Sequence, residues 1–296
     1  MSGVETLYTV LLVVALLLNG IAIAGATPMR RLLAPLRDAR TITLILVLDV
    51  VIVPLAVVGT GMLLDVDPVT RSGLVIVAAA SCGPIGMALA RIVRGDVPLS
   101  VTLVLGLGAL NVLSVPVVTG LLLPEGLTIP LPSLLTSLVG LAVMPLVLGR
   151  LVAHLLARTG ASDARRTGLL TLAGRVADVS LAGAIGTALL LEPRELVAVL
   201  TGPVLPIALL TMVVVLLGSR VVSGNEAVRR TVVVTINARA VGLALAIVTL
   251  HLSDVEGLRA VVLAYGGLTQ AVPVLVALGA RRLRAGATDG TTIASG

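Results

Sequence analysis

Long apolar segments separated by short polar connections occupy almost the whole chain. A membrane-spanning helix needs about 20 consecutive, mostly apolar residues. Nine segments meet that condition, namely residues 7–26, 41–63, 73–93, 98–123, 133–156, 169–191, 196–219, 231–251 and 258–280. No polar stretch between them is long enough to form a soluble domain. The pattern predicts an all-α, polytopic membrane protein with about nine transmembrane helices.

The composition agrees with a chain that lies mainly in lipid. Charged residues make up 12% of the sequence and hydrophobic residues 57%, whereas an average soluble domain has about a quarter charged residues. The net charge of +6 would suit nucleic acid, but the arginines are divided among the connections between apolar segments. We therefore expect the lipid bilayer as the surroundings and no nucleic-acid partner.

The arginines alternate between connections, and this alternation predicts the orientation. The arginine-rich connections hold Arg30, Arg31, Arg37 and Arg40; Arg91 and Arg94; Arg150, Arg158, Arg165 and Arg166; Arg220, Arg229 and Arg230; and finally Arg281, Arg282 and Arg284. The intervening connections hold only Arg71, Arg194 and Arg259. Because positive loops stay in the cytoplasm, we expect a multi-pass protein of the cell membrane with its N-terminus outside and its C-terminus inside. Residues 1–284 should form one transmembrane domain, and residues 285–296 a disordered cytoplasmic tail.

Two ionisable residues lie at matching depths in different apolar segments. Asp49 follows Arg40 by nine residues, and Arg239 follows Arg230 by nine residues. Both helices enter from the cytoplasm, so each group lies about 13–14 Å deep at 1.5 Å per residue, near the middle of a core about 30 Å thick. An ionisable group there costs about 2.5–3.5 kcal/mol. The matching depth permits an interhelical Asp49–Arg239 ion pair.

A second pair of ionisable residues, Arg175 and Asp178, lies within the sixth segment. Their spacing of three residues places them on one side of a helix, where they can pair with each other. For both pairs the alternative is that the charges only neutralise each other and position helices, without any part in transport.

Two apolar segments are interrupted near the middle of the membrane. The third contains Ser81, Cys82, Gly83, Pro84 and Gly86, and the eighth contains Thr235, Asn237, Arg239 and Gly242. Interruptions in oppositely directed helices are typical of inverted-repeat transporters, with the binding site where the discontinuous helices cross. The alternative is two unrelated kinks that aid packing.

Three further polar residues lie deep in their segments, namely Asn19, Asn111 and Gln270. They could line a transport pathway or make hydrogen bonds between helices. The complete predicted pathway comprises Asp49, Ser81, Cys82, Gly83, Pro84, Gly86, Asn111, Thr235, Asn237, Arg239 and Gln270. The sequence has no catalytic triad, no phosphate-binding loop and no histidine at metal-ligand spacing. We therefore expect no enzyme, no cofactor and no metal centre.

Three stretches resemble the bile acid:sodium symporter family. Residues 81–101, with the turn Gly95-Asp96-Val97, are similar to a broken helix of that family and the turn that follows it. Residues 48–55 resemble the preceding helix, and residues 239–247 resemble the second broken helix. The resemblance implies inverted repeats, interleaved panel and core helices, two sodium ions near the crossing, and an organic anion alongside.

The sodium ligands implied by this resemblance are mostly replaced. Gly86-Met87 stand where the family has Ser-Asn, and Asp49 stands where it has an amide. Thr235, Arg239 and Ala240 stand where it has Glu, Gln and Asn. A guanidinium could take the place of one cation, with Asp49 as its counter-charge. Transport would then be uncoupled, or coupled to protons through Asp49.

The sequence thus predicts a secondary transporter of a small organic anion or similar solute, without the family's sodium coupling. Arsenite permeases, distant relatives, carry a thiol thirteen residues before a Gly-Asp turn, as Cys82 precedes Gly95, and soft metalloids favour thiolate ligands. The eighth segment, however, lacks their acidic residue. A second alternative is a non-transporting sensor or subunit on the same fold. Substrate, direction and oligomeric state stay open.

Overall fold

The computed structural model describes residues 3–28, 38–124, 126–159, 162–191 and 193–271, and within these ranges it consists of helices joined by turns and short irregular segments, with no strand in them. The predicted tail, residues 285–296, lies outside the described residues. The helices, in chain order, are α1 (Gly3–Ala26), α3 (Ala39–Leu46), η2 (Val47–Ile52), α4 (Val53–Leu63), α5 (Pro68–Ala79), α6 (Ile85–Ile92), α7 (Val97–Leu122), α8 (Leu131–Leu138), η3 (Val139–Val143), α9 (Met144–Arg158), α10 (Asp163–Leu191), α11 (Pro193–Thr201), α12 (Val204–Val222), α13 (Glu226–Asn237) and α14 (Val241–His251). A last helix begins at residue 258 and is described to residue 271.

Seven helical segments among the described residues, some of them made of two or three consecutive helices, are long and apolar enough to cross a membrane. They are Gly3–Ala26, Ala39–Leu63, Val97–Leu122, Leu131–Arg158, Asp163–Leu190, Val204–Val222 and Glu226–His251. Each overlaps a predicted segment. The other two predicted segments differ, because 73–93 is divided between α5 and α6, and 258–280 is described only in part. The prediction of an all-helical, multi-pass membrane protein is confirmed.

The seventh predicted segment, 196–219, has a different boundary in the structure. α11 ends at Thr201, and α12 begins at Val204 after Pro203. Proline lacks the backbone N–H that an interior helical position donates, so Pro203 starts a new helix. The apolar count alone did not place this break.

Wide π-helical turns occur in two spanning helices, and each ends two residues before a proline. η2 (Val47–Ile52) precedes Pro54, and η3 (Val139–Val143) precedes Pro145. The proline ring clashes with the carbonyl four residues earlier and leaves it without its usual donor, which a widened turn relieves. η2 contains Asp49, so this local distortion determines where the carboxylate points.

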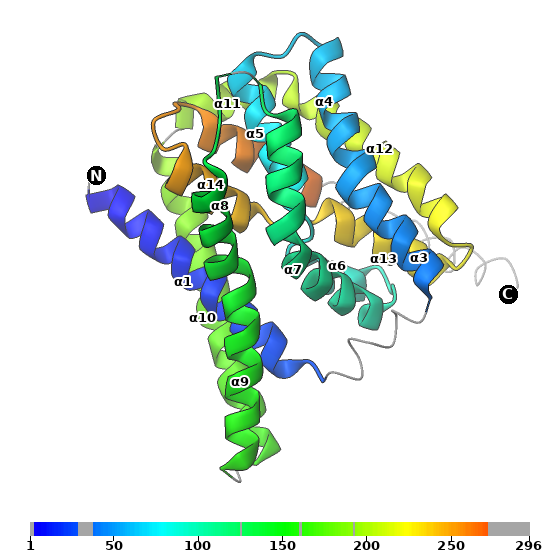
Figure 1. The fold of residues 1–296 in the computed structure, drawn as a ribbon, viewed down its shortest axis with the longest axis vertical. Helices are drawn as coiled ribbons and strands as arrows, with labels where there is room; N and C mark the ends of the chain where they lie inside the picture. Colours follow the sequence, from blue (N-terminus) through cyan, green and yellow to red (C-terminus); the bar gives the residue numbers. More distant parts are fainter. Residues whose placement is uncertain (1–2, 29–37, 125, 160–161, 192, 272–296) are drawn as a thin grey trace, which may run out of the picture.

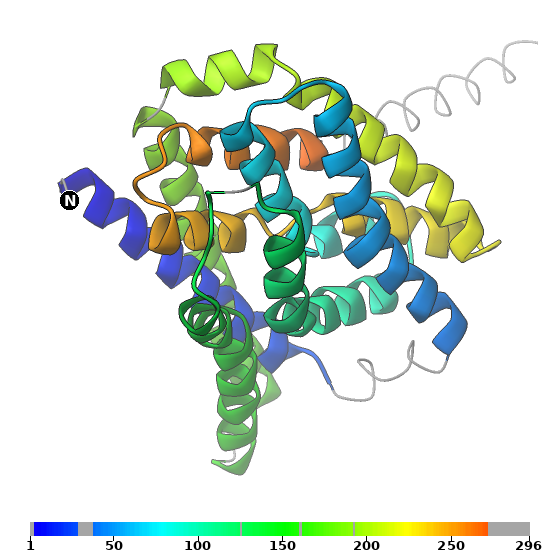
Figure 2. The ribbon, with the colours of Figure 1, turned by 45° about the horizontal axis from the view of Figure 1, so that its top comes forward.

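The helices fall into two groups in space. α1 lies along α9 and α10, and the lower ends of α9 and α10 extend beyond the other helices (Figure 1). In the turned view the same three helices again lie together, beside the helices formed by residues 39–122 and 193–271 (Figure 2). The grouping separates a small three-helix unit from a larger one that contains both interrupted helices.

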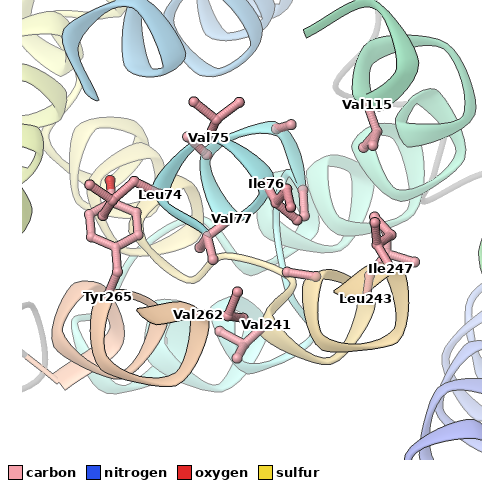
Figure 3. Packing of buried hydrophobic residues seen from close by; sticks show 14 of the residues in the cluster. Leu74, Val75, Ile76, Val77, Val115, Val241, Leu243, Ile247, Val262 and Tyr265 are labelled. Carbon is pink, nitrogen blue, oxygen red and sulfur yellow. The ribbon is translucent and has the colours of Figure 1, made fainter. Parts of the chain in front are cut away.

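The core of the larger group is formed by α5, α7, α14 and the last helix. Leu74, Ile76 and Val77 of α5 face side chains of α14 and of helix 258–271 (Figure 3). The helix pair Glu226–His251 is the most enclosed, with 89% of its most apolar stretch buried, compared with 50% or less for the other six spans. The pair therefore runs through protein and not along lipid, which is where an interrupted helix is tolerated.

Candidate functional site

The first interruption separates α5 from α6 and is held by a side chain from α7. The chain leaves helical geometry at Ala80 and re-enters it at Pro84. Proline disfavours helical geometry in the residue before it, here Gly83. Asn111 pairs with the freed backbone of Ser81: the Ser81 N–H donates to Asn111 Oδ1 (3.0 Å), and Asn111 Nδ2 donates to the Ser81 carbonyl (3.3 Å). Of the two alternatives for Asn111, the structure shows the hydrogen bonds to another segment, while a place in a transport pathway stays a prediction.

The second interruption, between α13 and α14, consists of two tight turns around Arg239. The Arg239 N–H donates to the Asn237 carbonyl (2.9 Å), and the Val241 N–H donates to the Arg239 carbonyl (2.8 Å). Ala238 and Ala240, the central residues, have φ near −77° and ψ near 65°, the geometry of inverse γ-turns. Gln270 Nε2 also donates to the Arg239 carbonyl, at 2.9 Å.

The two interruptions contact each other directly. The Gly83 N–H donates to the Ala238 carbonyl, and the Ala240 N–H donates to the Ala80 carbonyl at 3.2 Å. A Cβ on Gly83 would lie 2.6 Å from the Arg239 carbonyl oxygen, so this approach requires glycine. Backbone groups that two broken helices leave without helical partners are thus satisfied by one another.

The predicted Asp49–Arg239 ion pair is present beside this junction. Arg239 Nη1 lies 2.7 Å from Asp49 Oδ1 and also donates to the Ala78 carbonyl at 3.2 Å. The two side chains are 1% and 0% exposed. The pair joins η2, the end of α5 and the second interruption, three elements far apart in the sequence.

Several buried polar atoms around the junction have no hydrogen-bond partner among the described residues. They are Asp49 Oδ2, Ser81 Oγ, Asn237 Oδ1 and Arg239 Nη2. Buried polar atoms are nearly always paired in folded proteins, so each exception requires an explanation. Their concentration at the two interruptions distinguishes this region chemically from the apolar core around it.

The positions that resemble one sodium site are filled by protein. A Cβ on Gly86 would lie 3.2 Å from both Cα and Cγ2 of Thr235, so α6 and α13 are in direct contact there. The Thr235 hydroxyl pairs with the Ser100 hydroxyl at 3.0 Å. The neighbouring Met87 offers no oxygen, whereas hard cations need oxygen ligands. These residues do not fit a sodium ion.

The turn Gly95-Asp96 anchors the end of α6 to the first half of α13. Asp96 accepts from the Leu99 N–H (2.9 Å) as N-cap of α7, and the Asp96 N–H donates to the Thr231 hydroxyl (2.6 Å). A Cβ on Gly95 would lie 2.4 Å from Thr231 Oγ1. Sequence reasoning missed Thr231 and Ser100. For Thr231 a signal was available, because it lies four residues before Thr235 and so on the same face of the helix.

Arg175 and Asp178 do not form the ion pair that their spacing permits. The ion pairs between described residues include Arg166–Asp163, Arg230–Glu226 and Arg239–Asp49, but none joins Arg175 to Asp178. Both Arg175 and Asp178 are exposed on α10. The expectation of pairing on their own helix is wrong.

Cys82 lies at the first interruption and is 3% exposed, with an unusual φ of +31°. Among the described residues, no group of three or more His, Cys, Asp or Glu side chains is close enough to hold a metal ion.

A multi-pass helical protein with two interrupted helices joined around buried charges has the construction of a membrane transport protein. A sequence model of the sodium bile acid symporter family matches residues 10–193, and the chain belongs to this family. The family consists of transporters and not enzymes, which agrees with the expectation from the sequence. Comparison with curated proteins gave no match. The matched region ends before α13, so the positions around Arg239 lie outside it.

Proposed function

We propose that the chain is a secondary transporter of a small organic anion or similar solute, and that it moves this solute by alternating access at the junction of its two interrupted helices. The observation that carries the proposal is the buried Asp49–Arg239 pair beside the backbone contacts of Gly83 and Ala240. Irregular backbone and unpaired polar atoms at membrane depth are expected where a solute passes. On this proposal the α5–α6 and α13–α14 helices are the crossing helices of an inverted repeat.

We further propose that sodium does not drive this transporter. The Arg239 guanidinium supplies a fixed positive charge within the protein, and Asp49 neutralises it. The Gly86–Thr235 contact leaves only a threonine hydroxyl near the other expected ion position, and that hydroxyl is already paired with Ser100. Neither arrangement offers the several oxygen ligands that a bare cation requires.

Asp49 is the group that could couple transport to protons. One of its oxygens binds Arg239 while the other has no partner among the described residues. If the pair separates in another conformation, the carboxylate loses the counter-charge that Arg239 provides here. Proton uptake would then accompany one step of the cycle. The alternative within the same proposal is uncoupled transport.

We place the N-terminus outside and the C-terminus in the cytoplasm, as the arginine distribution indicates. The Arg-rich ends of α6, α9 and α13 then share the cytoplasmic side. Labelling of single cysteines from each side of intact cells tests this orientation. Labelling of Ser223→Cys from outside the cell would contradict it.

Uptake by reconstituted proteoliposomes tests the proposed function. Radiolabelled organic anions, a bile acid among them, are offered under three conditions: no ion gradient, an inward sodium gradient, and an inward proton gradient. We expect uptake above empty liposomes that is unchanged by sodium. Sodium stimulation would contradict the loss of sodium coupling, while stimulation by protons would favour proton-coupled over uncoupled transport. Absence of flux for every anion tested, from protein shown to be folded, would contradict transport of this solute class.

A further inference from the structure

One face of α10 is left uncovered by the rest of the described chain and carries two opposite charges. Residues on this face recur at alternating spacings of three and four, which aligns them along the helix. They are Gly168, Thr171, Arg175, Asp178 and Ala182, and all five are exposed. The opposite side of α10 packs along α1, where Ala177 and Ala184 are fully buried. We call the five exposed residues the α10 stripe.

The charges of the α10 stripe lie at the depth of the hydrocarbon core. Exposed apolar side chains on α10 extend from Leu169 to Leu190, a length of about 32 Å at 1.5 Å per residue. That length matches a hydrocarbon core about 30 Å thick. Asp178 lies about 13–14 Å and Arg175 about 9 Å inside the cytoplasmic edge of this band. A long arginine can reach back to the interface, but the short carboxylate of Asp178 cannot.

Neither charge finds a partner within the described part of the chain. Arg175 and Asp178 take part in no ion pair or hydrogen bond of side chains among the described residues. Ionisable residues in membrane segments nearly always face protein or water and pair with one another. A single exposed Asp178 in lipid is therefore unfavourable, and a partner that brings a positive charge to this depth would relieve it.

We propose that the α10 stripe is the interface of a homodimer in which Arg175 of each chain pairs with Asp178 of the other. Two copies inserted in the same orientation hold these residues at equal depths. A two-fold axis along the membrane normal makes the contact reciprocal, so one set of residues supplies two ion pairs. A second copy of this chain necessarily carries both charges at this depth, whereas a different partner would carry them only by coincidence.

The shape of the α10 stripe also suits a close helix–helix contact. A Cβ built on Gly168 would meet no atom within 4 Å, and a surface hollow lined by Thr167, Gly168, Thr171 and Arg175, among others, lies on this face. Small residues let membrane helices approach closely. The spacing of three and four residues is that of a seam between two parallel helices. An anionic lipid could satisfy Arg175 but would repel Asp178.

Disulfide cross-linking in membranes tests the interface without altering the charges. Ala182→Cys lies on the α10 stripe, whereas Leu121→Cys, on α7 and 77% exposed, is the matched control. The native Cys82 is 3% exposed and serves as background. We expect oxidation to link most of the Ala182→Cys protein as dimers, at least tenfold more than either the control or the parent. Equal cross-linking at both positions, or none, would overturn the proposal.

Charge exchange identifies the paired residues. Arg175→Asp leaves two acids on the α10 stripe and Asp178→Arg leaves two bases, so neither variant should associate with itself. When the two variants are co-expressed with different tags, the two acids of one variant face the two bases of the other. We expect each variant alone to lose at least tenfold in co-purification, and the mixture to regain the parental level. Dimers that persist in both single variants, or a mixture that stays as low as the variants alone, would overturn the pairing.

Discussion

Replacement of Arg239 by methionine is expected to destabilise the protein by about 3–5 kcal/mol, the cost of removing one partner from a buried ion pair. The change removes the 2.7 Å contact to Asp49 Oδ1 and the 3.2 Å hydrogen bond to the Ala78 carbonyl. Because Asp49 Oδ2 already has no partner among the described residues, both carboxylate oxygens would then be buried and unpaired. Thermal unfolding of the purified protein in detergent measures the loss.

The double variant Asp49→Leu/Arg239→Met separates charge from packing. Apolar residues of similar volume often replace a buried ion pair at little cost, so we expect the double variant to be within about 1 kcal/mol of the parent. Arg220→Met, at an exposed position of α12, is the matched control and should change stability by no more than about 0.5 kcal/mol. A double variant as unstable as Arg239→Met alone would refute the electrostatic explanation.

The same double variant distinguishes a transport role of the pair from a structural one. A pair that only positions helices can be replaced by apolar residues without loss of flux. We expect the double variant to be stable but to lose uptake in proteoliposomes, because the charges act on the solute or the proton. Parental uptake by the stable double variant would assign the pair to structure alone.

Three further changes test the junction and the Gly95-Asp96 turn, the first by uptake into proteoliposomes and the other two by thermal unfolding of the purified protein. Gly83→Ala places a Cβ 2.6 Å from the Arg239 carbonyl, so we expect the two interruptions to separate and uptake to be lost; normal uptake would contradict the contact. Asn111→Ala leaves the Ser81 peptide without its partners and should cost about 1–3 kcal/mol, whereas no change would show that this peptide needs no cap. Asp96→Ala removes an N-cap and should cost about 1 kcal/mol, with Asp96→Asn as the control that retains an acceptor.

The sequence was sufficient to predict the features that depend on local patterns. Apolar length predicts the spanning helices, and Gly83-Pro84 predicts the first interruption because proline and glycine act on their own neighbourhood. The Asp49–Arg239 pair was also predictable from the sequence, because equal spacing from Arg40 and Arg230 corresponds to equal depth along two helices. The structure adds the atoms that meet and the extent to which they are enclosed.

Features that depend on contacts between distant segments were not predictable in this way. Asn111 caps a break thirty residues earlier, and a deep amide gives no indication of which backbone it will bind. Thr231 binds the Asp96 turn across 135 residues. Pro54 indicates a distortion, but the wide turn that directs Asp49 depends on how the neighbouring helices pack.

Arg175 and Asp178 show the opposite failure, in which a local rule was applied where the tertiary context decides. A spacing of three residues permits a pair on one helix but does not enforce it. In the structure both side chains are exposed and neither contacts the other. Their role therefore depends on what covers α10, and the reciprocal dimer contact provides each charge with a partner.

On the proposed function, the buried Asp49–Arg239 pair has taken the place of sodium at the junction of the interrupted helices. A sodium titration of thermal stability tests this claim most directly, because it requires no knowledge of the solute. Purified protein is unfolded in rising sodium chloride, with potassium chloride keeping the ionic strength constant. A bound ion at 100 times its Kd would add about 2.7 kcal/mol of stability. We expect identical unfolding in both salts; a saturable stabilisation specific to sodium would contradict the claim.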